Sequence, residues 1–437
     1  FFKIKFLALR KVPVDENVLG QVSKKSKPRI IQLIFSSKTK NANLFEKRLY
    51  LIRKKVENEL CPRYKKFYIC SFSSKTIVYK GLLSSDQLAK FYKDLNDEQF
   101  IVKVALFHER FSTNTLSSWE MAQPFRLIAH NGEFNTIKGS RLWMKSREGN
   151  LESKVWQKEI RYLKPITKQT GSDSESFDNS AEFLKISGRD IFDTMMIMIP
   201  DSYEQTEKYY NNKKMNEMMR DYFIYHENFM KPWDGPAAIV YTDGDFVGAK
   251  MDRNGLRPLR YAKTSDNLFF AGSESGMITI PEEKIIEKGK LGPGQIIAID
   301  LKKGKLFRDK EIKDLLAKDY KKYSQQIIDL EKKISTDSEQ PKFTGEELKK
   351  RQYLSGLSIE DLEIILHPMA EEGKEASGSM GDDTPVAVLS SHYRPVSHYF
   401  RQNFSQVTNP PIDSLRENKV MSLKTRFGNL GNILDFD

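Results

Sequence analysis

Three polar segments carry residue types that could perform chemistry. They read HERFST at residues 108–113, HNGEFN at 130–135 and GSDSE at 171–175. An arginine binds a carboxylate with two parallel hydrogen bonds and an aspartate binds an ammonium group, so Arg110 and Asp173 could hold the two ends of a free amino acid. The Asn131 amide and the Gly132 N–H could donate to one oxygen, as in an oxyanion hole, where each donor contributes about 3–4 kcal/mol. Together they suit an amino acid whose side chain carries a carbonyl open to attack.

Each segment also has a purely structural explanation. Asn131-Gly132 is a strong turn signal, because glycine accepts a positive φ and asparagine tolerates the left-handed region. Ser172 and Glu175 have the spacing of a capping box at a helix start, where Asp173 would be stabilised by the helix dipole. Arg110 could form an exposed ion pair of little energetic value. Taken singly, the segments favour these structural explanations, and only their combination predicts a site.

Length and charge limit the classes of protein. A chain of 437 residues predicts two domains, or one large domain and part of another. The net charge is +12, but the basic residues form scattered pairs such as Lys24-Lys25 and Lys302-Lys303 among acidic residues. Nucleic-acid binding needs many phosphates neutralised together, so this spread disfavours a basic nucleic-acid-binding protein but leaves it open. No stretch approaches the ~18 apolar residues of a membrane span.

The cysteines and histidines carry no metal or disulfide signature. Cys61 and Cys70 are the only cysteines, which fits a reducing compartment, the cytoplasm or a plastid in a eukaryote. The six histidines show no HExxH or comparable ligand spacing, so no metal site is expected. The absence of a GxSxG motif argues against a serine hydrolase of that type.

Short strand-like runs and amphipathic helices together predict an α+β architecture. Strands are expected at residues 67–72, 76–79, 101–107, 126–129, 237–242, 245–251, 268–271 and 296–299. The YTDGD sequence at 241–245 predicts a hairpin between two of them. Helices are expected at residues 45–58, 174–187, 215–230 and 309–335. The polar stretch 335–345, with Pro341 and Gly345, predicts a linker before a second domain.

The motifs RFSTNT, HNGE and SDSESFDN, in this order, resemble those of the class II glutamine amidotransferases, and within them the large (α) subunits of glutamate synthases. The likeness covers essentially the whole chain, and only the Lys-rich loops are individual. The further matching segments are RKVPVD, KFYICSFSSKTIVYKG, SSWEMAQPFR, KPWDGPAAIVYTDG, KMDRNGLRPLRY, SESG, GSMGDDTPVAVL and QVTNPPIDSLRE.

This resemblance implies an N-terminal-nucleophile hydrolase fold, an αββα sandwich of two antiparallel sheets between helices. It implies that L-glutamine is hydrolysed to glutamate and ammonia through a thioester on an N-terminal cysteine, whose own α-amine is the base. By motif position, Asn131 and Gly132 form the oxyanion hole, Arg110 binds the α-carboxylate and Asp173 the α-ammonium of glutamine, with Thr113 as a neighbour in the pocket. Ammonia would then travel inside the protein to a flavin domain and react with 2-oxoglutarate.

The family's nucleophile is residue one of the mature subunit, whereas this chain begins with Phe1, and neither Cys61 nor Cys70 lies in the nucleophile's sequence context. We therefore expect the catalytic cysteine upstream of Phe1 and expect this chain alone to be inactive. Residues 1–351 would be the amidotransferase domain without its N-terminus, and 352–437 the beginning of an α/β central domain.

The resemblance places no cofactor in this segment. FMN and an iron–sulfur cluster are expected in the full-length subunit, with a small NADPH-oxidising subunit or ferredoxin as the electron-donating partner. Two alternatives stay open: a glutamine-binding regulatory module that never had the cysteine, and the basic nucleic-acid-binding protein.

Overall fold

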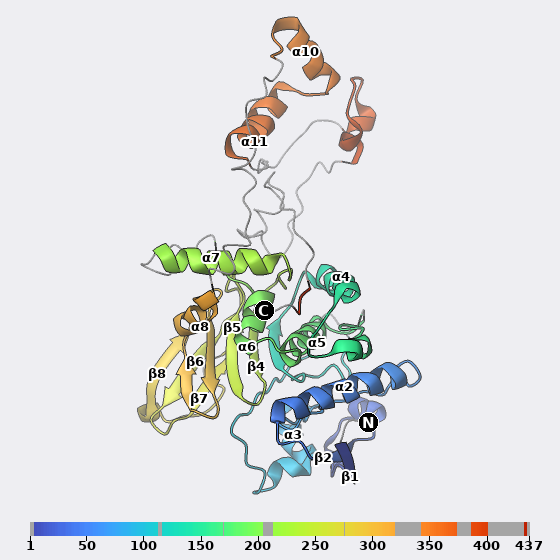
Figure 1. Cartoon of the computed structure of the whole chain (residues 1–437), viewed down its shortest axis with the longest axis vertical. Coiled ribbons are helices and arrows are strands. Elements are labelled where there is room, and N and C mark those ends of the chain that lie inside the picture. Colours follow the sequence, from blue (N-terminus) through green and yellow to red (C-terminus); the bar gives the residue numbers. More distant parts are fainter. Residues whose placement is uncertain are drawn as a thin grey trace.

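The computed structural model describes residues 4–111, 116–168, 170–203, 213–274, 276–319, 342–373, 386–400 and 432–434. Within this part of the chain, the named strands pair in three antiparallel sheets (Figure 1). One sheet pairs β1 (Ile4–Lys11) with β2 (Ile31–Ser37). The largest has the order β10-β9-β5-β4-β3, formed by Lys305–Phe307, Ile296–Asp300, Phe246–Met251, Ala237–Thr242 and Ile128–Gly132. The third has the order β7-β6-β8, formed by Phe269–Gly272, Arg260–Thr264 and Ile285–Lys290.

The α-helices are α1 Gln21–Ser26, α2 Ala42–Leu60, α3 Ser85–Phe91, α4 Ile137–Arg147, α5 Asp173–Ile186, α6 Ile191–Met198, α7 Lys213–Glu227, α8 Asp309–Leu316, α10 Gly345–Leu354 and α11 His367–Glu372. Helices α2 and α4 to α8 lie beside the strands (Figure 1). Short 3-10 helices occur at Glu16–Val18, Lys93–Asn96, Glu148–Asn150, Gln157–Leu163, Glu282–Lys284, Ala317–Asp319, Ala387–Leu389 and Val396–Phe400, and a π-helix at Asp361–Leu366.

The five-stranded sheet is buried on both faces, because alternate side chains of a strand point to opposite sides. In β4, Ala237, Ile239 and Tyr241 pack with residues of α5, α6 and α7 in one core cluster. Ala238 and Val240 point the other way, into a second cluster shared with β6 and β7. The result is a helix layer, the five-stranded sheet and the three-stranded sheet packed in that order (Figure 1).

Helix α5 begins where its capping sequence predicts. The Ser172 hydroxyl oxygen accepts a hydrogen bond from the Glu175 N–H at 3.0 Å, so one orphan donor of the first turn is satisfied. Asp173 is therefore the first helical residue and carries its charge at the positive end of the helix. Phe177, Ala181 and Leu184 form the buried face of the helix, which fixes its orientation against the sheet.

Three predicted strands are wrong. Residues 67–72, 76–79 and 101–107 belong to no strand. Their polar groups are bonded individually rather than in a ladder: the Ile69 carbonyl accepts from the Arg126 side chain at 2.7 Å, and the Val78 N–H donates to the Ser71 hydroxyl at 3.2 Å. β-Branched and aromatic composition favours an extended backbone, but a strand also requires a neighbouring backbone to pair with.

The other predicted elements are confirmed with shifted ends. The strand at 237–242 is β4, its predicted hairpin with β5 is present, β7 and β9 lie within one residue of expectation, and the ends of β3 are shifted by two and three residues. The helices expected at 45–58, 174–187 and 215–230 are α2, α5 and α7. The helix expected at 309–335 is α8 followed by the 3-10 turn Ala317–Asp319, and residues 320–341, with most of the expected linker, lie outside the described residues. None of the described helices has the length and apolarity needed to cross a membrane.

Candidate active site

Asn131 and Gly132 end strand β3, at the edge of the five-stranded sheet. The Asn-Gly turn predicted here is wrong, because these two residues pair with Ala238 and Ala237 of β4 and the chain leaves the sheet only afterwards. In an antiparallel pair, alternate residues turn their N–H groups away from the partner strand. On β3 the His130 N–H points away, donating to the Gln123 side chain at 2.6 Å, and Gly132 stands two residues further on the same side. The Gly132 N–H therefore faces the open edge of the sheet.

Glycine is required at position 132 for two reasons. Its φ is +144°, and a Cβ there would lie 1.7 Å from the carbonyl oxygen of Pro236. Gly235 on the opposing chain has φ +148°, and its Cβ would lie 1.9 Å from the Glu133 carbonyl oxygen. The two backbones thus cross so closely that neither position can hold a side chain, which fixes the path of the chain directly after Asn131.

Asp173 lies against this strand end. Its Oδ2 accepts a hydrogen bond from the Phe134 N–H at 2.8 Å, and the same oxygen lies 3.7 Å from His130 Nδ1. The side chain is 10% exposed, and a carboxylate has room for further donors on its two oxygens. The fold thus brings together Asn131, Gly132 and Asp173, although Asp173 is about forty residues further along the chain than the other two.

His130 is the buried support of this arrangement. Its ring stacks on Phe134 with the centroids 4.5 Å apart, and Nδ1 lies 2.9 Å from the Ser174 hydroxyl. Burial, the largest cause, lowers the pKa of His130 to about 4, although the nearby Asp173 carboxylate acts in the opposite direction. The imidazole is therefore neutral near pH 7 and serves as a packed hydrogen-bonding group.

Arg110 is exposed, and within the described residues the structure records no hydrogen bond or ion pair for its guanidinium. Its segment nevertheless passes near β3: burial lowers the pKa of His108, and the backbone groups of Arg110 and of His130 in β3 partly offset this. Thr113 lies outside the described residues. The structure therefore brings the Arg110 segment to the strand end and leaves the guanidinium pointing to solvent.

A further residue that the sequence analysis did not select reaches this site. Arg257 Nη2 donates to Asn131 Oδ1 at 2.5 Å. Arg257 belongs to the DRNGLRP turn between β5 and β6, 126 residues beyond Asn131. In the sequence, Arg257 stands in the KMDRNGLRPLRY segment, which showed the family resemblance. Nothing in that segment indicated that this arginine would contact the Asn131 amide.

The two cysteines are unsuited to nucleophilic attack. Both are free, and burial raises the pKa of each thiol above its usual value. The Cys70 thiol donates to the Val78 carbonyl oxygen and the Cys61 thiol to the Phe67 carbonyl oxygen, each at 3.4 Å. The thiolate is the reactive form, so these environments favour inert cysteines.

Two other kinds of site add nothing here. Among the described residues, no cluster of three or more His, Cys, Asp or Glu side chains is arranged to hold a metal ion. A cavity of about 10 Å³ beneath α7 is lined by Ile197, Tyr203, Phe223 and His226 among others, and has room for one water molecule. It contains none of the predicted site residues.

Comparison with known proteins identifies the family of this chain. The family described as "Glutamine amidotransferases class-II" matches residues 2–325, which is more than half of the chain. The chain therefore belongs to the class-II glutamine amidotransferases. A second family, described as the glutamate synthase central domain, matches residues 350–437.

Particular relatives extend along nearly the whole chain. The NADPH glutamate synthase large chain of Azospirillum brasilense is 47% identical over 435 residues, covering 98% of this chain and 28% of its own length. The ferredoxin-dependent glutamate synthase of Antithamnion sp. is 40% identical over 440 residues. The NADPH glutamate synthase large chain of Bacillus subtilis is 41% identical over 433 residues. These cover 99% and 98% of this chain, and the chain spans 28% of the length of each.

Proposed function

We propose that this chain is the glutaminase part of a glutamate synthase large chain, and that its site takes L-glutamine to glutamate and ammonia. The ammonia would be used on 2-oxoglutarate elsewhere in the same protein to form a second glutamate. The matches to both domain families and the named relatives support this proposal. The layers of helix, sheet and sheet support its finer form, the αββα sandwich of the N-terminal-nucleophile hydrolases.

The observation that carries the proposal is the hydrogen-bonding state of Asn131. Because its Oδ1 accepts from Arg257, its Nδ2 is turned outward as a donor, beside the edge that the Gly132 N–H faces. Two such donors, held before the reaction begins, stabilise the negative oxygen of a tetrahedral intermediate. Asp173, close by and nearly buried, suits the α-ammonium of the substrate, and the exposed Arg110 suits its α-carboxylate.

The reaction then follows from these roles. A thiolate attacks the glutamine side-chain carbonyl carbon, and the carbonyl electrons move onto the oxygen held by Asn131 Nδ2–H and Gly132 N–H. Collapse of this intermediate breaks the C–N bond, and the amide nitrogen leaves as ammonia after taking up a proton. Water then attacks the thioester carbonyl carbon, and the second oxyanion is stabilised by the same two donors. Its collapse breaks the C–S bond and releases glutamate and the thiol.

The thiolate must come from outside the described residues. Cys61 and Cys70 are partly buried with raised pKa values, and both donate to backbone carbonyls. The relatives are much longer than this chain, so the proposal assigns the nucleophile to an N-terminal cysteine of the full-length protein.

The other components of the proposed enzyme lie outside this segment as well. An iron–sulfur cluster needs four thiolates or equivalent ligands, and the two cysteines here do not provide that set. We therefore place the cluster and FMN in the remainder of the protein and derive no step through them. The electron donor would be NADPH through a second subunit, or ferredoxin, as the names of the relatives suggest. Within this chain, the proposed division into residues 1–351 and 352–437 is supported by the two separate family matches.

The full-length protein provides the test. We expect Asn131→Ala to lower kcat for glutamine hydrolysis by about 10²–10³, since one oxyanion donor is lost, with KM little changed. Arg110→Lys should chiefly raise KM, because lysine cannot form the bidentate contact with a carboxylate. Asn43→Ala, on the exposed surface of α2, is the matched control and should leave both constants unchanged. Ammonia release and glutamate formation are measured at varied glutamine concentration.

The outcomes separate the proposal from its alternatives. A wild-type protein that binds glutamine but does not hydrolyse it would be the regulatory glutamine-binding module. Retention on DNA or RNA that weakens steeply with salt, without glutamine binding, would indicate the nucleic-acid-binding alternative. An active enzyme in which Asn131→Ala keeps its kcat would remove the oxyanion assignment and leave the family assignment intact.

A further inference from the structure

The contact between Arg257 and Asn131 determines which end of the Asn131 amide is offered to a ligand. A guanidinium has only donors, so the atom that faces Arg257 Nη2 at 2.5 Å must be the amide oxygen. The amide nitrogen consequently points away from Arg257. Within the described residues, no acceptor is recorded for its two N–H groups. The torsion that rotates a side-chain amide is broad and roughly two-fold, so without such a partner the group could present its oxygen instead.

Arg257 is delivered to this position by a turn that is fixed to the same strand end. Asp252 Oδ1 accepts from the Asn254 N–H at 2.9 Å and the Leu256 N–H at 3.4 Å, which closes the turn. Asp252 Oδ2 accepts from the Ala237 N–H at 2.9 Å, and Ala237 is the residue paired with Gly132. The Asp252 side chain is buried, so this connection is shielded from water. The turn that carries Arg257 and the strand end at Asn131-Gly132 are therefore both attached to the start of β4 at Ala237.

The surroundings of Arg257 argue against a purely structural ion pair. The side chain is half-buried, and its Nε is buried with no hydrogen-bond partner in the described part of the chain. No carboxylate in that part is recorded as its salt-bridge partner. A half-buried arginine without an acid is costly to keep, because charged groups lose hydration on burial. Its recorded side-chain contact is with an uncharged amide, which gains a fixed orientation from it.

We infer that Arg257 is a positioning residue, which holds the Asn131 amide so that Nδ2 donates to the oxyanion formed from glutamine. This inference rests on the proposed function. Arg257 would not touch the reacting atoms. It acts through Asn131, by fixing the orientation of the amide.

The test uses the full-length protein with Arg257→Met and Arg257→Gln, the second made in case the first does not fold. Neither side chain provides the charged donor, so the amide can rotate and turn its oxygen toward the intermediate. We expect kcat for glutamine hydrolysis to fall by about tenfold or more, but by less than in Asn131→Ala, while KM stays within about threefold. Arg260→Met, three residues further at the exposed start of β6, is the control and should leave kcat unchanged. Thermal unfolding of every variant identifies those that are folded.

A double-mutant cycle distinguishes positioning from general structural support. If Arg257 acts only through the Asn131 amide, Arg257→Met should cause almost no further loss of kcat in an Asn131→Ala background. Fold-losses that multiply in the double variant would overturn the inference. So would a folded Arg257→Met or Arg257→Gln enzyme with wild-type kcat while Asn131→Ala is impaired. A wild-type protein without glutaminase activity would overturn the proposed function, and this inference with it.

Discussion

At the scale of single residues, the candidate site depends on groups whose orientation is restricted by close contacts and hydrogen bonds. Gly132 has a positive φ, and its backbone lies so close to the Pro236 carbonyl oxygen that no side chain fits. The Asn131 amide is oriented by its hydrogen bond from Arg257. His130 fills the space beneath them as a neutral ring stacked on Phe134. Such preorganisation is what electrostatic stabilisation of an oxyanion requires, because donors that must reorient during the reaction lose much of their effect.

Gly132→Ala tests the close crossing of the two chains. The new Cβ would lie 1.7 Å from a backbone oxygen, in a backbone conformation that alanine rarely adopts, so β3 and β4 must separate. We expect a loss of at least about 3 kcal/mol in the free energy of unfolding, at the upper end for single substitutions. Gly139→Ala is the matched control: Gly139 lies in α4 with open space where a methyl group would be added, and alanine should stabilise the helix by about 0.5–1 kcal/mol. Equal effects of the two substitutions in urea unfolding would contradict a tight crossing at Gly132.

His130 gives the fold a pH dependence whose sign follows from its burial. Its pKa is about 4 in the folded protein and about 6.5 in an unfolded chain, so between these values the unfolded chain binds a proton that the folded one does not. Stability contributed by the neutral ring is complete above about pH 6.5 and is lost as the pH falls toward about 4, by at most ~1.4 kcal/mol per pH unit.

His130→Gln should remove this component, so its free energy of unfolding should decline less than that of the wild type between about pH 6.5 and about pH 4.5. Urea unfolding at a series of pH values measures the two slopes. His367→Gln, at an exposed position on α11, is the control and should keep the wild-type slope. A parallel pH profile for His130→Gln and the wild type would show that the ring does not govern this dependence.

At the scale of elements, a buried charge cluster joins four parts of the main fold. Asp201, in the segment after α6, accepts from Lys250 Nζ of β5 at 3.0 Å and also pairs with Lys313 of α8. Lys313 Nζ also contacts Asp309 Oδ2 at 2.9 Å, and Asp309 Oδ1 accepts from the Ile296 N–H of β9 at 3.0 Å. These side chains connect the central sheet to the helices that cover it, and the cluster is satisfied only when all four elements are docked.

Asp201→Asn should therefore destabilise the protein strongly. Lys250 is fully buried and Lys313 nearly so, and removing the shared carboxylate charge leaves them poorly compensated. We expect a loss of about 3–5 kcal/mol in the free energy of unfolding. Asp266→Asn breaks an exposed pair with Lys284, which water screens, and should change the stability very little. Chemical unfolding of both variants checks the contrast, and a mild effect at Asp201 would mean that water or a rearrangement satisfies the lysines.

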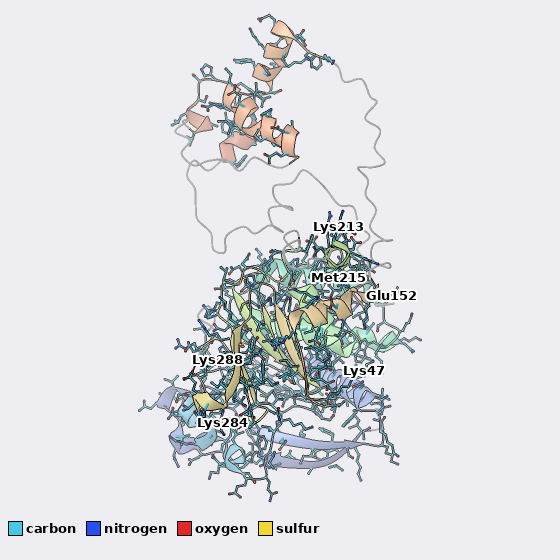
Figure 2. The ribbon with its side chains drawn as sticks, turned by 90° about the vertical axis from the view of Figure 1, so that its left-hand side faces the viewer. Lys47, Glu152, Lys213, Met215, Lys284 and Lys288 are labelled. Carbon is cyan, nitrogen blue, oxygen red and sulfur yellow. The ribbon has the colours of Figure 1, made fainter. Side chains whose placement is uncertain are left out.

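At the scale of the whole molecule, the site is assembled from separate segments of the chain. The strand end at 130–132, the start of α5 at Asp173, the start of β4 and the turn after β5 meet where β3 forms the edge of the five-stranded sheet. Lysines are dispersed over the surface: Figure 2 shows Lys213 on α7 and Lys284 and Lys288 around β8, on separate parts of the surface. Lys284 and Lys288 pair with Asp266 and Glu282. This distribution fits a solvated lysine-rich surface better than a continuous nucleic-acid-binding stripe.

Local sequence information was sufficient for elements whose determinants are local. The apolar run AAIVYT with a following Asp-Gly turn determined β4 and its hairpin, and the Ser172 cap determined the start of α5. It failed at residues 67–72 and 101–107, where strand-like composition meets no pairing backbone in the described structure. It also failed at Asn131-Gly132, because a turn dipeptide can equally end a strand when the chain it crosses leaves no room for a Cβ.

By itself, the sequence determined the family of this protein and the residue types of its candidate site, since these are carried by motifs of a few consecutive residues. Only the tertiary structure decided that Asn131 lies in a strand, that Asp173 reaches the Phe134 N–H, and that Arg257 orients the Asn131 amide. The physical reason is the range of the interactions. Helix caps and turn dipeptides depend on residues that are neighbours along the chain. The orientation of the Asn131 amide depends instead on Arg257, 126 residues away, which the packing of the two sheets brings close.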